Sequence, residues 1–387
     1  MKLAMRKLLI LGGDGYIGWP ASMFFSSTWD VTIIDSLIKR EWESMTNGRP
    51  LIPVPNIHER VHIWEKVSGR HIDVRIGDIK DAALVYGLLG QLRPDAVIHF
   101  AEQPSAPYSM ASRDHAVETQ MNNVIGTLNL IFAIRDIGID THLIKIGTMG
   151  EYGTPNIDIE EGFLEIAYKG RKDVLPFPKQ PGSFYHLSKV FDSQNLLFAA
   201  PIWGLRVTDL NQGVVYGIET KDTECAEGLH TSFHYDSVFG TVINRFCVQA
   251  VLGFPLTIYG SGSQKRSFIN LSDSLQCIHL SLEAPPKRGE YRVFNQFTEV
   301  FSIFEVAEII EQAGAEFDLQ VEIAPLENPR AEKSDHHYNP SNKNLLNLGL
   351  CQKNLSDVIL REIFRRILKY KDMVNRESLL PRIKWRR

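Results

Sequence analysis

Residues 7–18 read KLLILGGDGYIG, a short, mostly apolar run, Lys7–Leu11, followed by glycines at positions 12, 15 and 18. An apolar run of this length is typical of a strand buried on both faces of a sheet. The next segment, Ile17–Ser27, has the pattern of a helix. Glycines at such a turn let the backbone approach a ligand closely, and the helix amides then face an anion such as a pyrophosphate. The stretch therefore predicts the first unit of a nucleotide-binding sheet.

The next expected strand, Val31–Asp35, ends on a carboxylate. A carboxylate here can accept hydrogen bonds from the adenosine ribose of NAD and would repel the extra phosphate of NADP. Lys39 and Arg40 follow closely and could instead bind a 2′-phosphate. A purely structural glycine turn is the alternative, which strand, helix and acid together disfavour. We expect NAD, with the candidate ligands Gly12, Gly15, Tyr16, Ile17, Gly18, Asp35, Ser36, Arg40, Asp78, Ile79 and Asn122. Asp78 has a second interpretation, as the N-cap of the next helix.

Strand-like and helix-like segments alternate as far as about residue 210. Expected strands lie at 72–76, 96–101, 142–146 and 205–210, and expected helices at 82–91, 116–137 and 183–199. Such alternation predicts βαβ units and a parallel sheet with right-handed crossovers. The fold class is therefore α/β, a Rossmann-type doubly wound parallel sheet. We expect residues 1–210 to form the NAD-binding domain, with an insertion at 37–69. Residues 211–387 would form mainly a smaller substrate-binding domain, interleaved with the first.

Composition limits the functions that the chain can have. Its 387 residues carry a net charge of −4, which argues against a nucleic-acid binder or a membrane-surface binder. The four cysteines lie in no metal-binding pattern, so we expect no metal, no disulfide framework and a reducing compartment. No apolar stretch is long enough for a transmembrane helix.

A second motif carries the candidate chemistry. SFYHLSK places Tyr185 and Lys189 four residues apart, on one face of an expected helix. A neighbouring ammonium and an oxidised nicotinamide would lower the pKa of the phenol, which makes the tyrosine a base near neutral pH. Thr148, at the end of an earlier strand, would orient the reacting hydroxyl. The alternative is an amphipathic surface helix, which the agreement of three separate features disfavours.

With these motifs the chain resembles the extended short-chain dehydrogenases/reductases that modify nucleotide sugars. Within that family it is most similar to the enzymes that join sulfite to UDP-glucose. The resemblance runs nearly end to end and rests on segments such as GGDGYIGW, HFAEQPSAPYSM, GTMGEYGTPNIDIEEG, PKQPGSFYHLSK and TDLNQGVVYG. A UDP-hexose 4-epimerase, a 4,6-dehydratase and a non-catalytic NAD-binding sensor are the alternatives.

The resemblance implies a reaction that starts at C4 of glucose. Tyr185 takes the proton of the 4-hydroxyl while hydride passes to NAD. Loss of the C5 proton and the 6-hydroxyl gives a 4-keto-5,6-ene, sulfite adds at C6, and the hydride returns to C4. In related dehydratases an acidic pair follows the threonine, but here the next residue is Met149. We expect Glu151 or His186 to supply the acid–base function, with loop stabilisation and helix packing as their respective alternatives.

The resemblance also implies a substrate site and an assembly. The candidate substrate ligands are Gln103, Ser105, Thr148, Asn211, Gln212, Tyr216, Thr257, Tyr259, Arg266 and Arg330. The two arginines would bind the diphosphate, and surface ion pairs are their alternative. Pro104 stands where plant members of the group carry a basic residue. Helices 116–137 and 183–199 resemble those that pair in homodimers of this family. Since no plastid-type leader precedes the first strand, we expect a cytoplasmic enzyme.

Overall fold

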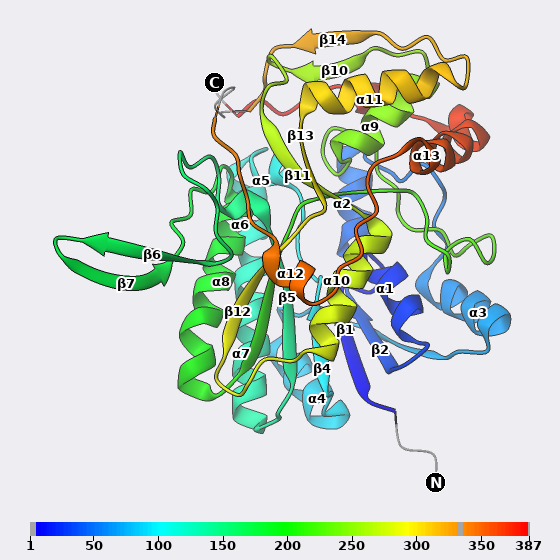
Figure 1. The fold of residues 1–387 in the computed structure, drawn as a ribbon. Helices are drawn as coiled ribbons and strands as arrows, with labels where there is room; N and C mark the ends of the chain where they lie inside the picture. The colour runs from blue at the N-terminus through cyan, green and yellow to red at the C-terminus, as the bar shows by residue number, and fades with distance from the viewer. Residues whose placement is uncertain (1–4, 331–335, 386–387) are drawn as a thin grey trace.

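The computed structural model describes residues 5–330 and 336–385 and is built around one seven-stranded sheet (Figure 1). Every neighbouring pair in it is parallel, in the order β12-β8-β5-β4-β1-β2-β3. This is the Rossmann order with one added strand, so the predicted fold class is confirmed. The strands are β1 (Lys7–Leu11), β2 (Asp30–Asp35), β3 (Ile72–Ile76), β4 (Ala96–His99), β5 (His142–Thr148), β8 (Arg206–Gln212) and β12 (Tyr291–Gln296).

Helices cover both faces of the sheet, because successive strand residues point to opposite sides. Leu9 packs with one apolar cluster, which includes residues of α4 (Ala82–Leu92), α7 (Gly126–Ile137) and α8 (Phe184–Trp203). Ile10 packs with another cluster on the opposite face. The helices on that face are α1 (Gly18–Phe25), α3 (Ile57–Ser68) and α10 (Leu271–Glu283).

The predicted insertion at 37–69 contains two helices, α2 (Ile38–Thr46) and α3. Arg60 of α3 is fully buried and binds back to the glycine loop. Its guanidinium donates to Asp14 Oδ1 at 2.8 Å and stacks 4.3 Å from the Trp19 ring. The insertion therefore braces the turn between β1 and α1.

The second half of the chain forms a smaller lobe beyond the carboxyl ends of the large sheet, at the top of Figure 1. A separate apolar core holds this lobe together. Within this half of the chain, α10 and β12 belong to the large sheet, so the two halves are interleaved. The domain boundary at residue 210 stays a prediction. The elements of the smaller lobe are β9 (Val214–Tyr216), α9 (Val242–Val251), β10 (Leu256–Tyr259), β11 (Lys265–Asn270), β13 (Glu299–Ser302), α11 (Ile303–Ala315), β14 (Ile323–Leu326), α13 (Asp357–Tyr370), η3 (Lys371–Met373) and η4 (Arg376–Leu379). The short helix α12 (Lys343–Asn347) lies against the large sheet instead, with Leu345 in the same apolar core as Phe294 of β12.

Two elements differ from the sequence predictions. The expected helix 116–137 is α6 (Arg113–Gln120), a π-helical turn η1 (Met121–Ile125) and α7. An unpredicted hairpin, β6 (Phe163–Tyr168) and β7 (Arg171–Pro176), projects from the body beside α8 (Figure 1). Within the described residues, no helix has the length and apolar character needed to cross a bilayer.

Candidate active site

A cavity of about 650 Å³ opens at the carboxyl ends of the large sheet. It lies where the strand order reverses between β1 and β4, the place at which doubly wound sheets bind ligands. Gly12 after β1, Asp35 of β2, Gly77 after β3 and Phe100 after β4 all line it. Topology therefore brings the predicted cofactor residues together.

The glycine loop allows the close packing that the motif predicts. A side chain on Gly18 would place its Cβ 2.0 Å from the Gly12 carbonyl oxygen. Gly12 has a φ of +85°, and a Cβ there would meet the backbone of Phe100 and Ala101 at 2.7 Å. Neither position can carry a side chain without moving the loop. Ile17, the N-cap residue of α1, contributes no side-chain hydrogen bond, so the helix amides face the loop without a side-chain cap.

Asp35 lines the cavity in the arrangement expected for a ribose ligand. Its carboxylate accepts hydrogen bonds from the amides of Asp14 (2.9 Å) and Leu37 (2.7 Å), which hold it in place. Arg40 is engaged elsewhere, because its guanidinium binds both oxygens of Asp14 at 2.7 and 3.0 Å. Lys39 binds Glu43 at 2.9 Å. Both cations that could have served a 2′-phosphate therefore have carboxylate partners, which favours NAD.

Most of the other cofactor candidates line the cavity, whereas Tyr16 does not. Gly15, Ser36, Asp78, Ile79 and Asn122 line the cavity. Tyr16 lies behind the loop, where its hydroxyl donates to the Gly217 carbonyl of the smaller lobe at 2.5 Å. The alternative of Asp78 as a helix cap is wrong, because Asp81 caps α4 and Asp78 accepts from the Lys80 amide instead.

Thr148 ends β5 and begins the short 3₁₀ turn η2 (Met149–Glu151). Its hydroxyl accepts a hydrogen bond from the Gly150 amide at 3.1 Å, and its own amide donates to Glu151 at 3.3 Å. The turn packs against α8, since a Cβ on Gly150 would lie 2.4 Å from His186 Nε2. The threonine is therefore held in one orientation beside the helix that carries Tyr185.

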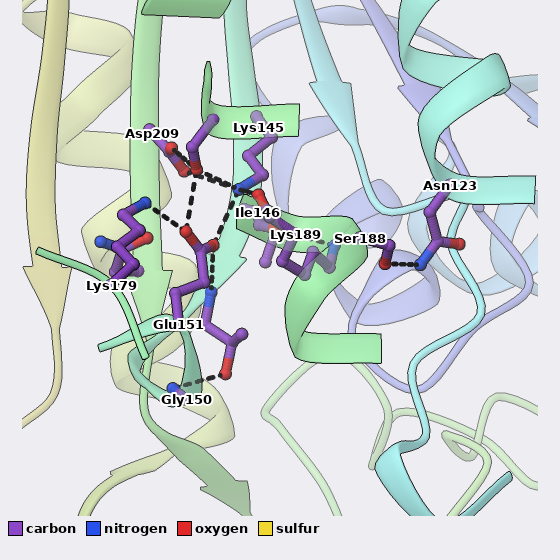
Figure 2. Close-up of polar contacts among 12 residues, drawn as sticks. Asn123, Lys145, Ile146, Gly150, Glu151, Lys179, Ser188, Lys189 and Asp209 are labelled. Atoms are coloured by element: carbon purple, nitrogen blue, oxygen red, sulfur yellow. Dashed lines mark hydrogen bonds and ion pairs between the residues drawn. The ribbon is translucent and has the colours of Figure 1, made fainter. Parts of the chain in front are cut away.

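Glu151 is fully buried at the centre of an ionic network (Figure 2). Its carboxylate binds the ammonium groups of Lys145 (3.0 Å) and Lys179. Lys145 also lies 3.3 Å from Asp209. Burial raises the pKa of Glu151, but the two lysines outweigh it and lower the pKa to about 2. These contacts favour the structural alternative for Glu151, and its acid–base role stays a prediction.

Met149 and His186 occupy different environments. Met149 is buried in an apolar cluster with Tyr152, Ile159 and Phe177, which explains why an apolar side chain follows the threonine. His186 is partly buried on the first turn of α8, with Nδ1 3.1 Å from the Ser183 hydroxyl. Of the two residues proposed for acid–base chemistry, His186 is the more exposed.

Lys189 is held close to Tyr185 but has other partners. Its ammonium lies 2.5 Å from Glu102 and donates to the Ile146 carbonyl at 2.7 Å, while the Tyr185 ring centroid is 5.9 Å away. Burial, followed by the Glu102 carboxylate, raises the pKa of Tyr185 above its ordinary value. The lowered pKa that the motif predicts is therefore not found in the polypeptide alone, where burial and the Glu102 carboxylate outweigh the cations. Lys145 lowers the pKa of Tyr185 in part, and the positive charge of an oxidised nicotinamide would lower it further.

Several predicted substrate residues bind the protein itself. Asn211 donates to the Tyr152 hydroxyl at 2.9 Å, and Gln212 donates to Ser274 at 2.8 Å. Gln103 accepts from the Ser105 amide at 3.2 Å, and the Ser105 hydroxyl donates to the Val238 carbonyl at 2.5 Å. Of these contacts, the one from Ser105 to Val238 reaches the smaller lobe. Their contact with substrate stays a prediction.

The remaining substrate candidates lie in the smaller lobe. Tyr216 is buried, with its hydroxyl 3.4 Å from Glu299. Thr257 accepts from Gln249 at 2.8 Å. Tyr259 and Arg330 line one small cavity, whereas Arg266 donates to the Lys265 carbonyl at 2.8 Å. Arg330 also stacks 5.5 Å from the Trp385 ring.

Sequence reasoning missed the residues that connect the cofactor cavity to the catalytic helix. Glu102 lines the cavity and contacts Lys189, so it links the two. Its position directly after the β4 run is a signal, because carboxyl ends of strands meet at the ligand edge. Lys145 inside the apolar run of β5 is a second signal, since buried lysines need charged partners.

Comparison with known proteins agrees with this geometry. The sequence pattern of the NAD dependent epimerase/dehydratase family matches residues 8–295. The chain belongs to this family, and NAD is its cofactor. Within the family it belongs with the UDP-sulfoquinovose synthases. It is 47% identical to the chloroplastic enzyme of Spinacia oleracea over 99% of this chain and 80% of that protein. It is 43% identical to the Sulfolobus acidocaldarius enzyme over 98% of both chains.

Solved structures show the same fold at lower identity. UDP-glucuronic acid 4-epimerase from Bacillus cereus, in complex with UDP-glucuronic acid and NAD, is 19% identical with a TM-score of 0.69. The match covers 94% of this chain and 99% of that one. The dTDP-glucose 4,6-dehydratase of Neisseria meningitidis is a more distant relative by sequence, 26% identical over 71% of this chain and 67% of that protein.

Proposed function

We propose that this protein is a UDP-sulfoquinovose synthase, which converts UDP-glucose and sulfite into UDP-sulfoquinovose. The observation that carries the proposal is 47% identity to such an enzyme across 99% of the chain. The cavity at the sheet edge, with Asp35 and the glycine loop, fits the NAD that this chemistry needs.

The residues of the site suit a reaction at C4 of the sugar. NAD, when bound, would supply the hydride acceptor for oxidation at that carbon and the hydride donor for its final reduction. Tyr185 removes the proton of the 4-hydroxyl, which Thr148 orients, and Lys189 holds the cofactor end of the site. The C5 proton and the 6-hydroxyl then leave together as water, and His186, the more exposed of the two candidates, would carry these proton transfers. Sulfite adds to C6, C5 regains a proton, and Tyr185 returns its proton to the C4 oxygen.

The substrate is held, in this proposal, by the smaller lobe. Thr257 and Tyr259 would face the uridine, and Arg266 and Arg330 the diphosphate, for which guanidinium groups are suited. Gln103, Ser105, Asn211, Gln212 and Tyr216 would shape the sugar end from behind. A cytoplasmic location is also part of the proposal, because four cysteines in 387 residues suit a reducing compartment.

The mass of the product tests this function. Purified protein is incubated with UDP-glucose, with and without sulfite. We expect a product heavier than UDP-glucose by the exchange of the 6-hydroxyl for a sulfonate, and only when sulfite is present. A product of unchanged mass would indicate an epimerase, and loss of water without sulfur incorporation would indicate a dehydratase.

We further propose a homodimer through α6 and α8. Phe184, Phe191 and Phe198 repeat every seven residues on α8, and all three are exposed, Phe198 to 63%. Val117 and Met121 add exposed apolar side chains on the adjoining helices α6 and η1. Apolar stripes of this kind mark helix-pairing surfaces.

Placing a charge in this stripe should separate the subunits. We expect Phe198→Lys to convert a dimer into a monomer in sedimentation velocity, because a lysine there would be buried without a partner. Phe304→Lys on α11 is the matched control, since Phe304 is exposed to 43% but lies outside the stripe. A wild-type protein that is monomeric at every concentration would contradict the proposal.

A further inference from the structure

Glu102 is a buried carboxylate that no step of the proposed reaction uses. It follows β4, its side chain is 2% exposed, and it lines the cofactor cavity. Its Oε2 atom lies 2.5 Å from the Lys189 ammonium. Apart from this ion pair, neither oxygen accepts a hydrogen bond from any residue that the structure describes. A carboxylate left with one charged partner is strongly bound to it.

The nearest histidine does not compensate this charge. His99 Nε2 is 4.0 Å from Glu102 Oε1. Burial lowers the pKa of His99 to about 4, so the ring is neutral at physiological pH. Lys189 is therefore the cation on which Glu102 depends.

A wider buried cluster surrounds the pair. Asp192 lies one turn after Lys189 on α8 and is fully buried. Burial, followed by the Glu102 carboxylate, raises the pKa of Asp192 well above its usual range. The charged and titratable groups that face this region are His99 of β4, Lys145 of β5, Glu151 of η2, Lys179 of the loop before α8, His186, Lys189 and Asp192 of α8, and Asp209 of β8.

We propose that Glu102 is a positioning residue for the sugar oxidation, which fixes the Lys189 ammonium against β4 and sets the pH at which Tyr185 becomes a base. This inference rests on the proposed function only in taking Tyr185 as the base at C4. Glu102 acts through charge: its carboxylate cancels the field of Lys189 at the phenol and disfavours the phenolate. Tyr185 then ionises only once a positively charged ligand such as oxidised nicotinamide is bound. Proton removal is thereby restricted to protein that carries its cofactor.

Glu102→Gln tests the proposal. The substitution removes a negative charge near Tyr185 and leaves Lys189 without its counter-ion, and both changes favour the phenolate. We expect the acidic limb of the pH profile for NADH formation from UDP-glucose to move to lower pH by roughly one unit, the scale of a nearby charge. Glu102→Asp retains the charge, so the acidic limb of its pH profile should lie at the wild-type pH even if its rate falls.

Removing the Glu102 charge should lower the pKa of Asp192, since Glu102 raises it, and an ionised Asp192 would replace the lost negative charge. The double variant Glu102→Gln with Asp192→Asn removes this compensation and should shift the limb further. Glu118→Gln is the matched control. Glu118 accepts hydrogen bonds from Trp42 at 2.9 Å and Tyr108 at 2.5 Å and forms no ion pair with Lys189 in the structure. The acidic limb of the Glu118→Gln pH profile should therefore stay where it is in the wild type.

A second measurement does not depend on turnover. In NAD-bound protein with isotope-labelled tyrosine, the NMR signal that Tyr185→Phe removes reports ionisation of this phenol. We expect ionisation to begin at lower pH in Glu102→Gln. The proposal would be overturned if, in both the single and the double variant, the Tyr185 phenol titrated as in the wild type and the acidic limb of NADH formation did not move. Wild-type protein that forms NADH but no sulfonated sugar would instead refute the proposed function and leave the Glu102 result standing.

Discussion

Replacing Tyr185 with phenylalanine should lower turnover of UDP-glucose by about a hundredfold to ten-thousandfold, the usual contribution of a general base. The substitution removes only the hydroxyl that takes the C4 proton, and the ring keeps its place beside His186. Binding of NAD and UDP-glucose should change little. Single-turnover formation of NADH after mixing with UDP-glucose measures the effect.

Tyr86→Phe is the control for loss of a tyrosine hydroxyl. Tyr86 lies on α4 with its hydroxyl 2.6 Å from Asp136, on the surface and away from the cavity. Its rate should match the wild type. A Tyr185→Phe protein that forms NADH at the wild-type rate would remove this residue from the chemistry.

Glu151→Gln should lower the free energy of unfolding by roughly 3 kcal/mol, because it leaves Lys145 and Lys179 with too little negative charge in a buried site. The pKa of Glu151 in the fold is about 2, below its value in an unfolded chain of about 4.3. Its contribution is therefore present above pH ~4.3 and is lost as the pH falls through about 2. Urea unfolding at neutral pH and at a series of acidic pH values measures both effects.

The same variant decides between the two roles of Glu151. A structural role predicts lower stability, with turnover largely kept in the folded fraction. Wild-type stability with NAD bound but turnover abolished would show that Glu151 takes part in the chemistry. Glu165→Gln is the control, because its ion pair with Lys172 lies on the exposed hairpin and should contribute little.

The fold was predictable because its strands are short apolar runs whose ends the sequence marks. β1 and β3 begin and end where predicted, and the cavity lies after the glycine loop as expected. The π turn η1 was not predictable from helical periodicity, since Asn123 inside it binds Gln103 and Ser188, residues distant in the chain. Such long-range hydrogen bonds leave no local pattern.

The hairpin β6–β7 left a signal that periodicity alone overlooks. Lys169 and Gly170 both have positive φ and form a two-residue loop, since Tyr168 pairs with Arg171. A glycine at the second position of a tight turn favours this geometry. Its strands are mostly exposed, so no apolar alternation reveals them.

Site residues that share one sequence motif could be predicted from the sequence. Those brought together by ion pairs between distant segments could not. Tyr185 and Lys189 share a helix, so their proximity follows from their spacing. The partner of Lys189 is Glu102, from a different strand end, and the partners of Glu151 are lysines from β5 and from the loop before α8. These pairings follow from the three-dimensional arrangement of the sheet, and they changed the expected charge at Tyr185.

The fate of the hydrogen on C4 tests the central claim most directly. UDP-glucose that carries deuterium at C4 is converted with sulfite in ordinary water, and the product is analysed by mass spectrometry and NMR. If NAD stays bound and returns the hydride that it took, the sulfonated product keeps its deuterium at C4. Sulfonated product with deuterium lost from C4, or formed at equal rate by protein stripped of NAD, would contradict oxidation and reduction at that carbon.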